Sequence, residues 1–239
     1  MLYRRRNGPK NRFCGAFCWK GAQGFTYLQT IIAKLSHFKS IIEATNVKGS
    51  VCTLIEVEHL TKRYGGHTAV DDISFTVEDG CIYGLLGPNG AGKSTTMNII
   101  TGYISATDGT VKIDGHDIAD EPAAAKACIG YLPELPPLYQ DMTVQEYLLF
   151  VAELKGTRKK ADRAAAVEKF AARAGLQGME HRLIRNLSKG YRQRVGIAAA
   201  LLGTPKVIIL DEPTVGLDPA QMIEIRSLIR DLGKTHTVI

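Results

Sequence analysis

The sequence predicts an α/β fold organised around a phosphate-binding loop, and three observations support this. Residues 87–94 read Gly-Pro-Asn-Gly-Ala-Gly-Lys-Ser and lie between a short apolar run and the start of a helix. Gly87 is separated by four residues from Gly92-Lys93-Ser94. Between a strand and a helix, this spacing is typical of loops that bind phosphates. Residues 207–210, Val-Ile-Ile-Leu, are typical of a central parallel strand. From residue 54 onward, strand-like and helix-like segments follow one another.

The expected strands are short apolar or β-branched runs bounded by turn residues. They cover residues 54–58, 69–77, 81–83, 109–113, 129–132 and 207–210, and residues 237–239 begin one more. Residues 133–137, Pro-Glu-Leu-Pro-Pro, cannot be helical and are expected to form a loop.

Helices are expected where apolar residues recur at helical spacing or where capping residues mark an end. Thr143 and Glu146 form a capping-box pattern ahead of one such helix. Asp218-Pro219 gives another helix an N-cap and a proline at its first position. The remaining helices are expected directly after the phosphate loop and at residues 121–127, 159–173 and 189–202.

The chemistry of the phosphate loop follows from its residue types. Its glycines let backbone N–H groups turn inward, and the helix N-terminus adds positive charge, so the loop forms a nest for an anion. Lys93 would reach the β- and γ-phosphates of a nucleotide, and the Ser94 hydroxyl would take a place on Mg²⁺. The alternative is an ordinary glycine-rich turn followed by an unrelated lysine. A chance turn does not account for the spacing of Gly87 and Gly92 or for the position of the loop between a strand and a helix.

Charge divides the chain into two parts. Residues 1–53 hold nine Lys/Arg and one acid, a net charge of +8, whereas the other 186 residues hold 21 bases and 23 acids, a net charge of −2. The main domain, residues 54–239, therefore has no electrostatic sign of nucleic-acid binding. The basic leader, residues 1–53, could be a targeting segment or a basic membrane-surface helix. A disordered leader or a non-native extension is favoured, because the regular pattern starts abruptly at Leu54.

The composition is that of an ordinary globular protein, with 45% hydrophobic residues. No apolar run approaches the roughly 20 residues that a membrane span needs. The five cysteines suggest no disulfide framework and fit a reducing compartment.

Two further groups of residues carry chemistry. Asp211 and Glu212 follow the apolar run 207–210, where a carboxylate can serve Mg²⁺ and a second one can polarise an attacking water. Taken alone, each acid would be interpreted as a turn or N-cap residue. Ser188 and Gly190 stand at a helix start, which gives a second anion-binding end, although Ser188 also fits an ordinary N-cap.

Together with the phosphate loop, these motifs resemble the ATP-binding subunit of ATP-binding-cassette (ABC) transporters, over residues 54–239. The family's signature usually reads Leu-Ser-Gly-Gly-Gln, and here residues 187–191 read Leu-Ser-Lys-Gly-Tyr. Residues 216–219 resemble its D-loop, and residues 131–134 its Q-loop, with Glu134 where most members have Gln. Tyr64 stands where the family has an adenine-stacking aromatic; its alternative is a turn tyrosine packed on the sheet. Residues 132–139 and 187–194 look most like ABC-2-type exporters.

The resemblance implies a P-loop NTPase core with an antiparallel β subdomain and an inserted helical subdomain at about residues 135–185. It implies ATP and Mg²⁺ as cofactors, Glu212 and Lys93 as catalytic residues, and Ser94 and Asp211 as metal ligands. The implied nucleotide contacts are Tyr64, Gly87, Pro88, Asn89, Gly90, Ala91, Gly92, Lys93, Ser94, Thr95, Glu134, Ser188, Gly190 and Asp211.

The same resemblance implies a homodimer or a paired ATPase subunit, with each ATP between Lys93 of one chain and Ser188 of the other. It implies integral membrane transporter subunits as partners and a cytoplasmic position, peripheral on the inner face of the cell membrane. The substrate carried is not indicated. The sequence stops where the family's histidine-bearing strand begins, so the chain as given is expected to bind ATP and hydrolyse it weakly.

Two other functions stay open at this stage. A soluble ABC protein could use ATP to clamp nucleic acid or ribosomes, but this chain has one cassette and an acidic main domain. An ATP-binding interaction subunit without turnover is the second alternative.

Overall fold

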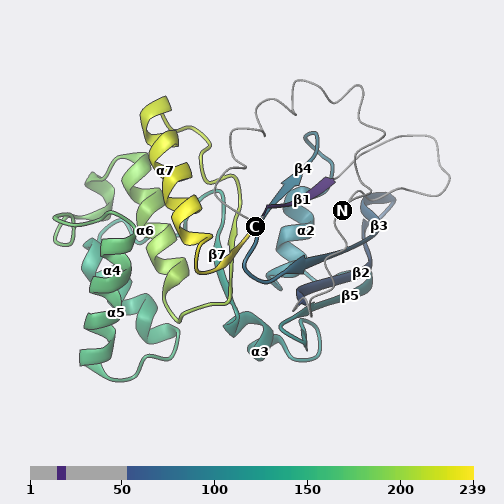
Figure 1. Ribbon diagram of the computed structural model, residues 1–239, viewed down its shortest axis with the longest axis horizontal. Helices are drawn as coiled ribbons and strands as arrows, with labels where there is room; N and C mark the ends of the chain where they lie inside the picture. Colours follow the sequence, from purple (N-terminus) through teal and green to yellow (C-terminus); the bar gives the residue numbers. More distant parts are fainter. Residues whose placement is uncertain (1–14, 20–52) are drawn as a thin grey trace.

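The computed structural model of the protein describes residues 15–19 and 53–239 (Figure 1). Its central sheet has the strand order β1-β4-β9-β8-β7. The strands are β1 (Gly15–Trp19), β4 (Ile82–Leu86), β9 (Thr237–Val238), β8 (Val207–Leu210) and β7 (Ile129–Leu132). The pairs from β4 to β7 are parallel, and β1 alone is antiparallel to its neighbour. The α/β prediction is confirmed.

Strand β8 is buried on both faces of this sheet, as its β-branched apolar sequence predicts. Val207 and Ile209 belong to one hydrophobic cluster, here called the loop-side core, which also holds Met97. Ile208 and Leu210 belong to a second cluster, the helix-side core. Successive side chains of a strand point to opposite faces, so the central sheet separates the two cores.

The second sheet is antiparallel, with the order β3-β2-β5-β6. Its strands are β3 (His67–Glu78), β2 (Thr53–Tyr64), β5 (Asp108–Ile113) and β6 (His116–Asp117). Strands β2 and β3 extend beyond the predicted runs 54–58 and 69–77, because their pairing continues to the hairpin turn between Tyr64 and His67. Helix α2 (Lys93–Ile100) packs between the two sheets in the loop-side core (Figure 1).

The other helices gather at the opposite side of the central sheet, except for the short α3 (Pro122–Ala127) (Figure 1). They are α4 (Val144–Leu154), α5 (Lys160–Arg173), the 3-10 turn η1 (Ile184–Asn186), α6 (Lys189–Leu201) and α7 (Pro219–Leu232). The capping box at the start of α4 is confirmed, since Glu146 N–H donates to Thr143 Oγ1 at 3.2 Å and Thr143 N–H donates to Glu146 Oε2 at 2.8 Å. Helices α4 and α5 fill the region expected to be the helical subdomain, 135–185.

One short segment differs from the expectation of a disordered leader. The backbone of residues 15–19 forms β1, with Gly15 opposite Leu86 and Trp19 opposite Ile82. These residues are therefore not disordered, because their main chain pairs with the edge of β4 that faces away from β9. The rest of the predicted leader lies outside the described residues. Nowhere in the described ranges is a helix long and apolar enough to cross a membrane.

Candidate nucleotide-binding site

The phosphate loop connects β4 to α2 and depends on two glycines with positive φ. Gly90 has φ +76°, and Gly92, the residue that caps α2, has φ +87°. A Cβ atom at Gly92 would lie 2.5 Å from the backbone oxygen of Ala69 in β3, whereas a Cβ at Gly90 would meet nothing within 4 Å. Only glycine therefore fits at position 92 without displacing a neighbouring strand.

Lys93 is the first residue of α2, and its ammonium group folds back over the loop. Its Nζ donates to the backbone oxygens of Gly87 at 2.7 Å and Pro88 at 3.1 Å. Helix α2 has no side-chain cap and no acid in its first turn. The positive end of this helix and the lysine thus face the same loop, which suits an anion. Ser94 and Thr95 occupy the next two positions of the helix.

Three carboxylates converge near this lysine at the end of the neighbouring parallel strands. Asp211 directly follows β8, is 8% exposed, and its N–H donates to the Leu132 carbonyl of β7 at 2.9 Å. Burial, and then the charges of Glu212 and Glu134, raise the pKa of Asp211, while Lys93 lowers it. The fold therefore brings together four charged groups from three distant parts of the sequence, around Lys93, Glu134 and the adjacent pair Asp211 and Glu212.

The backbone is strained beside this cluster. Glu212 has φ +46°, a left-handed conformation that costs a non-glycine residue on the order of 1 kcal/mol. Val215 N–H donates to the Glu212 carbonyl at 3.1 Å, which closes a tight turn after the strand. Strain of this kind persists only where the surrounding structure holds the backbone in place.

The donor set suits Mg²⁺ bound together with a nucleotide. The described residues contain no group of three or more His, Cys, Asp or Glu side chains arranged to hold a metal by themselves. Mg²⁺ commonly takes one or two protein ligands and completes its shell with substrate phosphates and water. A buried carboxylate at Asp211 and a hydroxyl at Ser94 match that requirement.

Tyr64 ends β2 at the hairpin turn and is 50% exposed. Lys62 Nζ lies 5.1 Å from the centroid of the Tyr64 ring and donates to the Ser105 carbonyl at 2.7 Å. The aromatic side chain is thus not buried against the sheet. The sequence interpretation did not identify Lys62, although a lysine two residues before an aromatic in a strand lies on the same face.

The second anion-binding end lies at the start of α6. Ser188 caps this helix, and its Oγ accepts from Tyr191 N–H at 3.4 Å. A Cβ at Gly190 would lie 2.9 Å from the Gln221 side chain of α7. The signature residues therefore pack directly against the beginning of α7, which the D-loop residues precede.

The structure does not unite this helix start with the phosphate loop in one chain. Leu187 belongs to the helix-side core, whereas Met97 and Ile99 of α2 belong to the loop-side core. The central sheet separates the two cores, so Ser188 and Lys93 lie in different layers of the same molecule. Of the predicted site residues, the loop, Asp211, Glu212 and Glu134 come together, while Ser188 and Gly190 stand apart.

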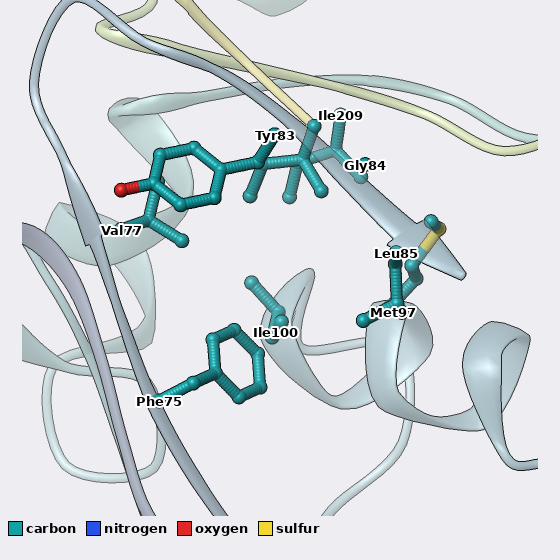
Figure 2. Close-up of a pocket in the computed structure, with 9 residues that line it drawn as sticks. Phe75, Val77, Tyr83, Gly84, Leu85, Met97, Ile100 and Ile209 are labelled. Carbon is teal, nitrogen blue, oxygen red and sulfur yellow. The ribbon is translucent and has the colours of Figure 1, made fainter. Parts of the chain in front are cut away.

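Two of the hollows in the described part of the molecule lie near the proposed site or its helices. The smaller, about 10 Å³, lies between β3, β4 and α2 and is lined by apolar groups of Phe75, Val77, Tyr83, Gly84, Leu85, Met97, Ile100, Ile209 and Ile239 (Figure 2). It has barely the volume of one water molecule, so it is part of the packing behind the loop.

The larger hollow is a groove of about 320 Å³ between the end of α2, β7, α4 and α6, which the sequence did not indicate. Its lining includes Tyr103, Tyr131, Tyr147, Lys126 and Lys155, and Tyr103 is 79% exposed. Lys155 Nζ donates to the Ala200 carbonyl at 3.1 Å, and burial lowers the pKa of this lysine to about 8.

Comparisons with known proteins show the family to which the chain belongs. The family model described as ABC transporter matches residues 70–215. The chain is 40% identical over 186 residues to the bacitracin transport ATP-binding protein BcrA of Bacillus licheniformis, covering 78% of this chain and 60% of that one. It is 37% identical over 182 residues to the lipopolysaccharide export system ATP-binding protein LptB of Haemophilus influenzae, covering 75% and 76%. The chain thus spans about 60% of the length of BcrA and similar relatives.

Solved structures give the same result. The structure of cbiO1 from Clostridium perfringens, part of the ABC transporter complex cbiONQ, matches with a TM-score of 0.69 and 28% identity over 78% of this chain and 77% of that one. The ADP conformation of MJ1267, an ATP-binding cassette of an ABC transporter, matches with a TM-score of 0.67 and 29% identity over 78% and 79%. On the family match, the sequence relatives and the shared fold, this chain belongs to the ABC transporter family as an ATP-binding domain.

Proposed function

We propose that the protein binds and hydrolyses ATP and thereby powers transport of a substrate through partner membrane subunits. The observation that carries this proposal is the cluster of Asp211, Glu212 and Glu134 beside Lys93 of the phosphate loop. Carboxylates and a lysine at the ends of parallel strands, next to a helix N-terminus, are the parts that phosphoryl transfer needs.

Binding would rest on the loop and on Tyr64. The backbone N–H groups from Gly87 to Thr95 and the Lys93 ammonium would hold the phosphates, and the exposed ring of Tyr64 would stack on the adenine. Ser94 and Asp211 would hold Mg²⁺, which supplies neutralisation of phosphate charge when bound. Lys93 must leave the Gly87 and Pro88 carbonyls to reach a phosphate, so an anion replaces two hydrogen bonds already present.

Catalysis would rest on position and charge. Glu212 would orient the attacking water, and its left-handed backbone, with φ +46°, would help to direct its side chain. Lys93 and the loop N–H groups would stabilise the charge that develops on the transferred phosphoryl oxygens. Glu134, in the position where most relatives have glutamine, would approach the water or Mg²⁺ from β7.

Two copies would be needed for a complete site, as a homodimer or a paired ATPase subunit. Ser188 and Gly190 stand at a helix start that suits an anion, yet the central sheet separates them from Lys93 of the same chain. A head-to-tail arrangement would place ATP between the loop of one copy and Ser188 of the other.

The groove near α4 and α6 would receive a helical segment of the membrane partner. Its walls are largely aromatic and aliphatic, and its lining holds Lys126 and Lys155 without any acidic side chain. An apolar helix that carries an acidic residue would complement it in shape and charge. The protein would then be cytoplasmic and peripheral on the inner face of the cell membrane.

An exporter of the ABC-2 type is the transporter class that we propose. Relatives are named for bacitracin transport and for lantibiotic transport, which supports this class but does not identify the substrate of this protein. The alternative of a nucleic-acid clamp receives no support from charge, since residues 54–239 carry a net −2.

The decisive experiment changes Glu212 to Gln in the full-length protein. Nucleotide binding, followed with a fluorescent ATP analogue, should be retained, and turnover should fall about 10²- to 10⁴-fold. An ATP-bound dimer should then accumulate in size-exclusion chromatography. Glu168→Gln, at an exposed acid on α5, is the matched control and should leave binding and turnover unchanged. Normal turnover in the Glu212→Gln variant would show that Glu212 is only a turn residue. If the parent protein binds ATP without hydrolysing it, the alternative of an ATP-binding interaction subunit would be favoured.

A further inference from the structure

The two residues proposed to hold Mg²⁺ stand on separate elements of the fold. Ser94 is the second residue of α2, and Asp211 directly follows β8. Mg²⁺ demands short bonds and a near-ideal octahedral shell, so a small shift of one ligand against the other weakens binding. The site therefore depends on whatever fixes α2 against the ends of β7 and β8.

A side-chain hydrogen bond joins α2 to the central sheet close to these ligands. Tyr131 of β7 donates its hydroxyl proton to Asn98 Oδ1 of α2 at 3.3 Å. Within the ranges that the structure describes, it is the only side-chain hydrogen bond between α2 and strands β7 or β8. The other contacts of this helix with the sheet lie in the loop-side core and are apolar. Apolar contacts have no preferred direction, so the hydrogen bond is what sets the position of the helix along the sheet.

Both ends of this bond are one structural repeat away from a proposed metal ligand. Asn98 follows Ser94 by four residues, so the two side chains share one face of α2 and lie about one turn apart. Tyr131 is paired with Ile209 in the parallel register of β7 and β8, and Asp211 follows Ile209 by two residues. Side chains two residues apart on a strand point to the same face of a sheet. The hydrogen bond thus lies directly beneath the pair of ligands, on the face of the sheet that α2 covers.

The surroundings of Tyr131 keep its hydroxyl in the role of a donor. The residue is half-buried, and its ring packs against the loop-side core. Burial, and then the charges of Asp211 and Tyr103, raise the pKa of Tyr131, so the hydroxyl stays protonated. The effect of Asp211 also shows that the ring lies close to this carboxylate.

We propose that Tyr131 is a positioning residue that acts through Asn98 to hold Ser94 at the spacing from Asp211 that a bound Mg²⁺ requires. This inference rests on the proposed site for ATP and Mg²⁺. Tyr131 itself would touch neither the nucleotide nor the ion. The loop N–H groups and Lys93 would hold the phosphates without its help, so its effect should be confined to the part of nucleotide affinity that Mg²⁺ supplies.

The test is Tyr131→Phe, which removes the hydroxyl and keeps the ring. A fluorescent ATP analogue is titrated in Mg²⁺ and again in EDTA, and the ratio of the two affinities measures what the ion contributes. Loss of one hydrogen bond should lower this ratio about 3- to 10-fold, while the affinity in EDTA changes less than about twofold. A variant that is only less stable would lose affinity equally in both conditions.

Tyr147→Phe is the matched control. Tyr147 lines the same groove as Tyr131, and its hydroxyl also donates over 3.3 Å, but to the Pro137 carbonyl, and its ring belongs to the helix-side core. This variant should leave the ratio of affinities unchanged. Urea unfolding should show a similar loss of unfolding free energy in both variants, so stability would not explain a difference between them.

Asn98→Ala removes the acceptor of the same bond and should lower the ratio by the same factor as Tyr131→Phe. The double variant should show no further fall, because both substitutions act through one contact. An unchanged ratio after either single substitution, or a further fall in the double variant, would overturn the inference. If the parent protein does not bind the analogue, or binds it no better in Mg²⁺ than in EDTA, the proposed function fails instead.

Discussion

Replacement of Gly92 by alanine isolates the structural requirement of the phosphate loop. The φ of +87° alone costs an alanine about 1–2 kcal/mol. In addition, the new Cβ would lie 2.5 Å from the Ala69 carbonyl, which must move by about 0.9 Å to reach an ordinary 3.4 Å contact. Crowding of this kind costs about 1–3 kcal/mol. The expected loss of unfolding free energy is therefore about 2–5 kcal/mol, a large part of the 5–15 kcal/mol of a typical domain.

Gly90→Ala is the matched control for this prediction. Its φ is +76°, close to that of Gly92, but a Cβ there meets nothing within 4 Å. It should lose only the conformational part, about 1–2 kcal/mol. Urea unfolding of both variants without nucleotide measures the difference, which is the cost of the collision with β3. Equal stability of the two variants would refute the argument that β3 fixes the position of the loop.

Three further predictions concern other parts of the chain. Lys93→Ala should abolish ATP binding or weaken it severely in a fluorescent-nucleotide titration, because the phosphates lose their point charge; unchanged affinity would contradict the loop assignment. Although Lys155 is exposed as a whole residue, desolvation of its ammonium group beside Ala200 lowers its pKa to about 8. Below that pH the folded state bears the cost of this partly desolvated charge, and the cost is relieved as pH rises from 8 towards 10.5. Lys155→Met should accordingly flatten the rise of the unfolding free energy with pH, measured by urea unfolding. A rise parallel to that of the parent would show that Lys155 does not have a lowered pKa. A chain that begins at Thr53 should still bind ATP, with lower stability where β4 loses its pairing with β1; loss of binding would make the leader a structural part.

Much of the fold could be predicted because its signals are local. The spacing of the phosphate loop, the apolar run of β8, and the capping box of Thr143 and Glu146 each lie within a few residues along the chain. Sequence spacing and residue type define such features directly, and the structure confirms the strand, the helix starts and the α/β class. The chemistry expected of Lys93, Asp211 and Glu212 was also recognisable from their immediate neighbours.

Only the tertiary structure decided which of these groups meet. The order β1-β4-β9-β8-β7 brings Asp211 and Glu134 to Lys93, and it places Ser188 on the other side of the sheet. The need for glycine at position 92 comes from a carbonyl in β3, and the close packing of Gly190 comes from Gln221 of α7. Contacts of this kind join residues distant in sequence. They depend on how the chain crosses between sheets and layers, which the pattern of any single segment does not encode.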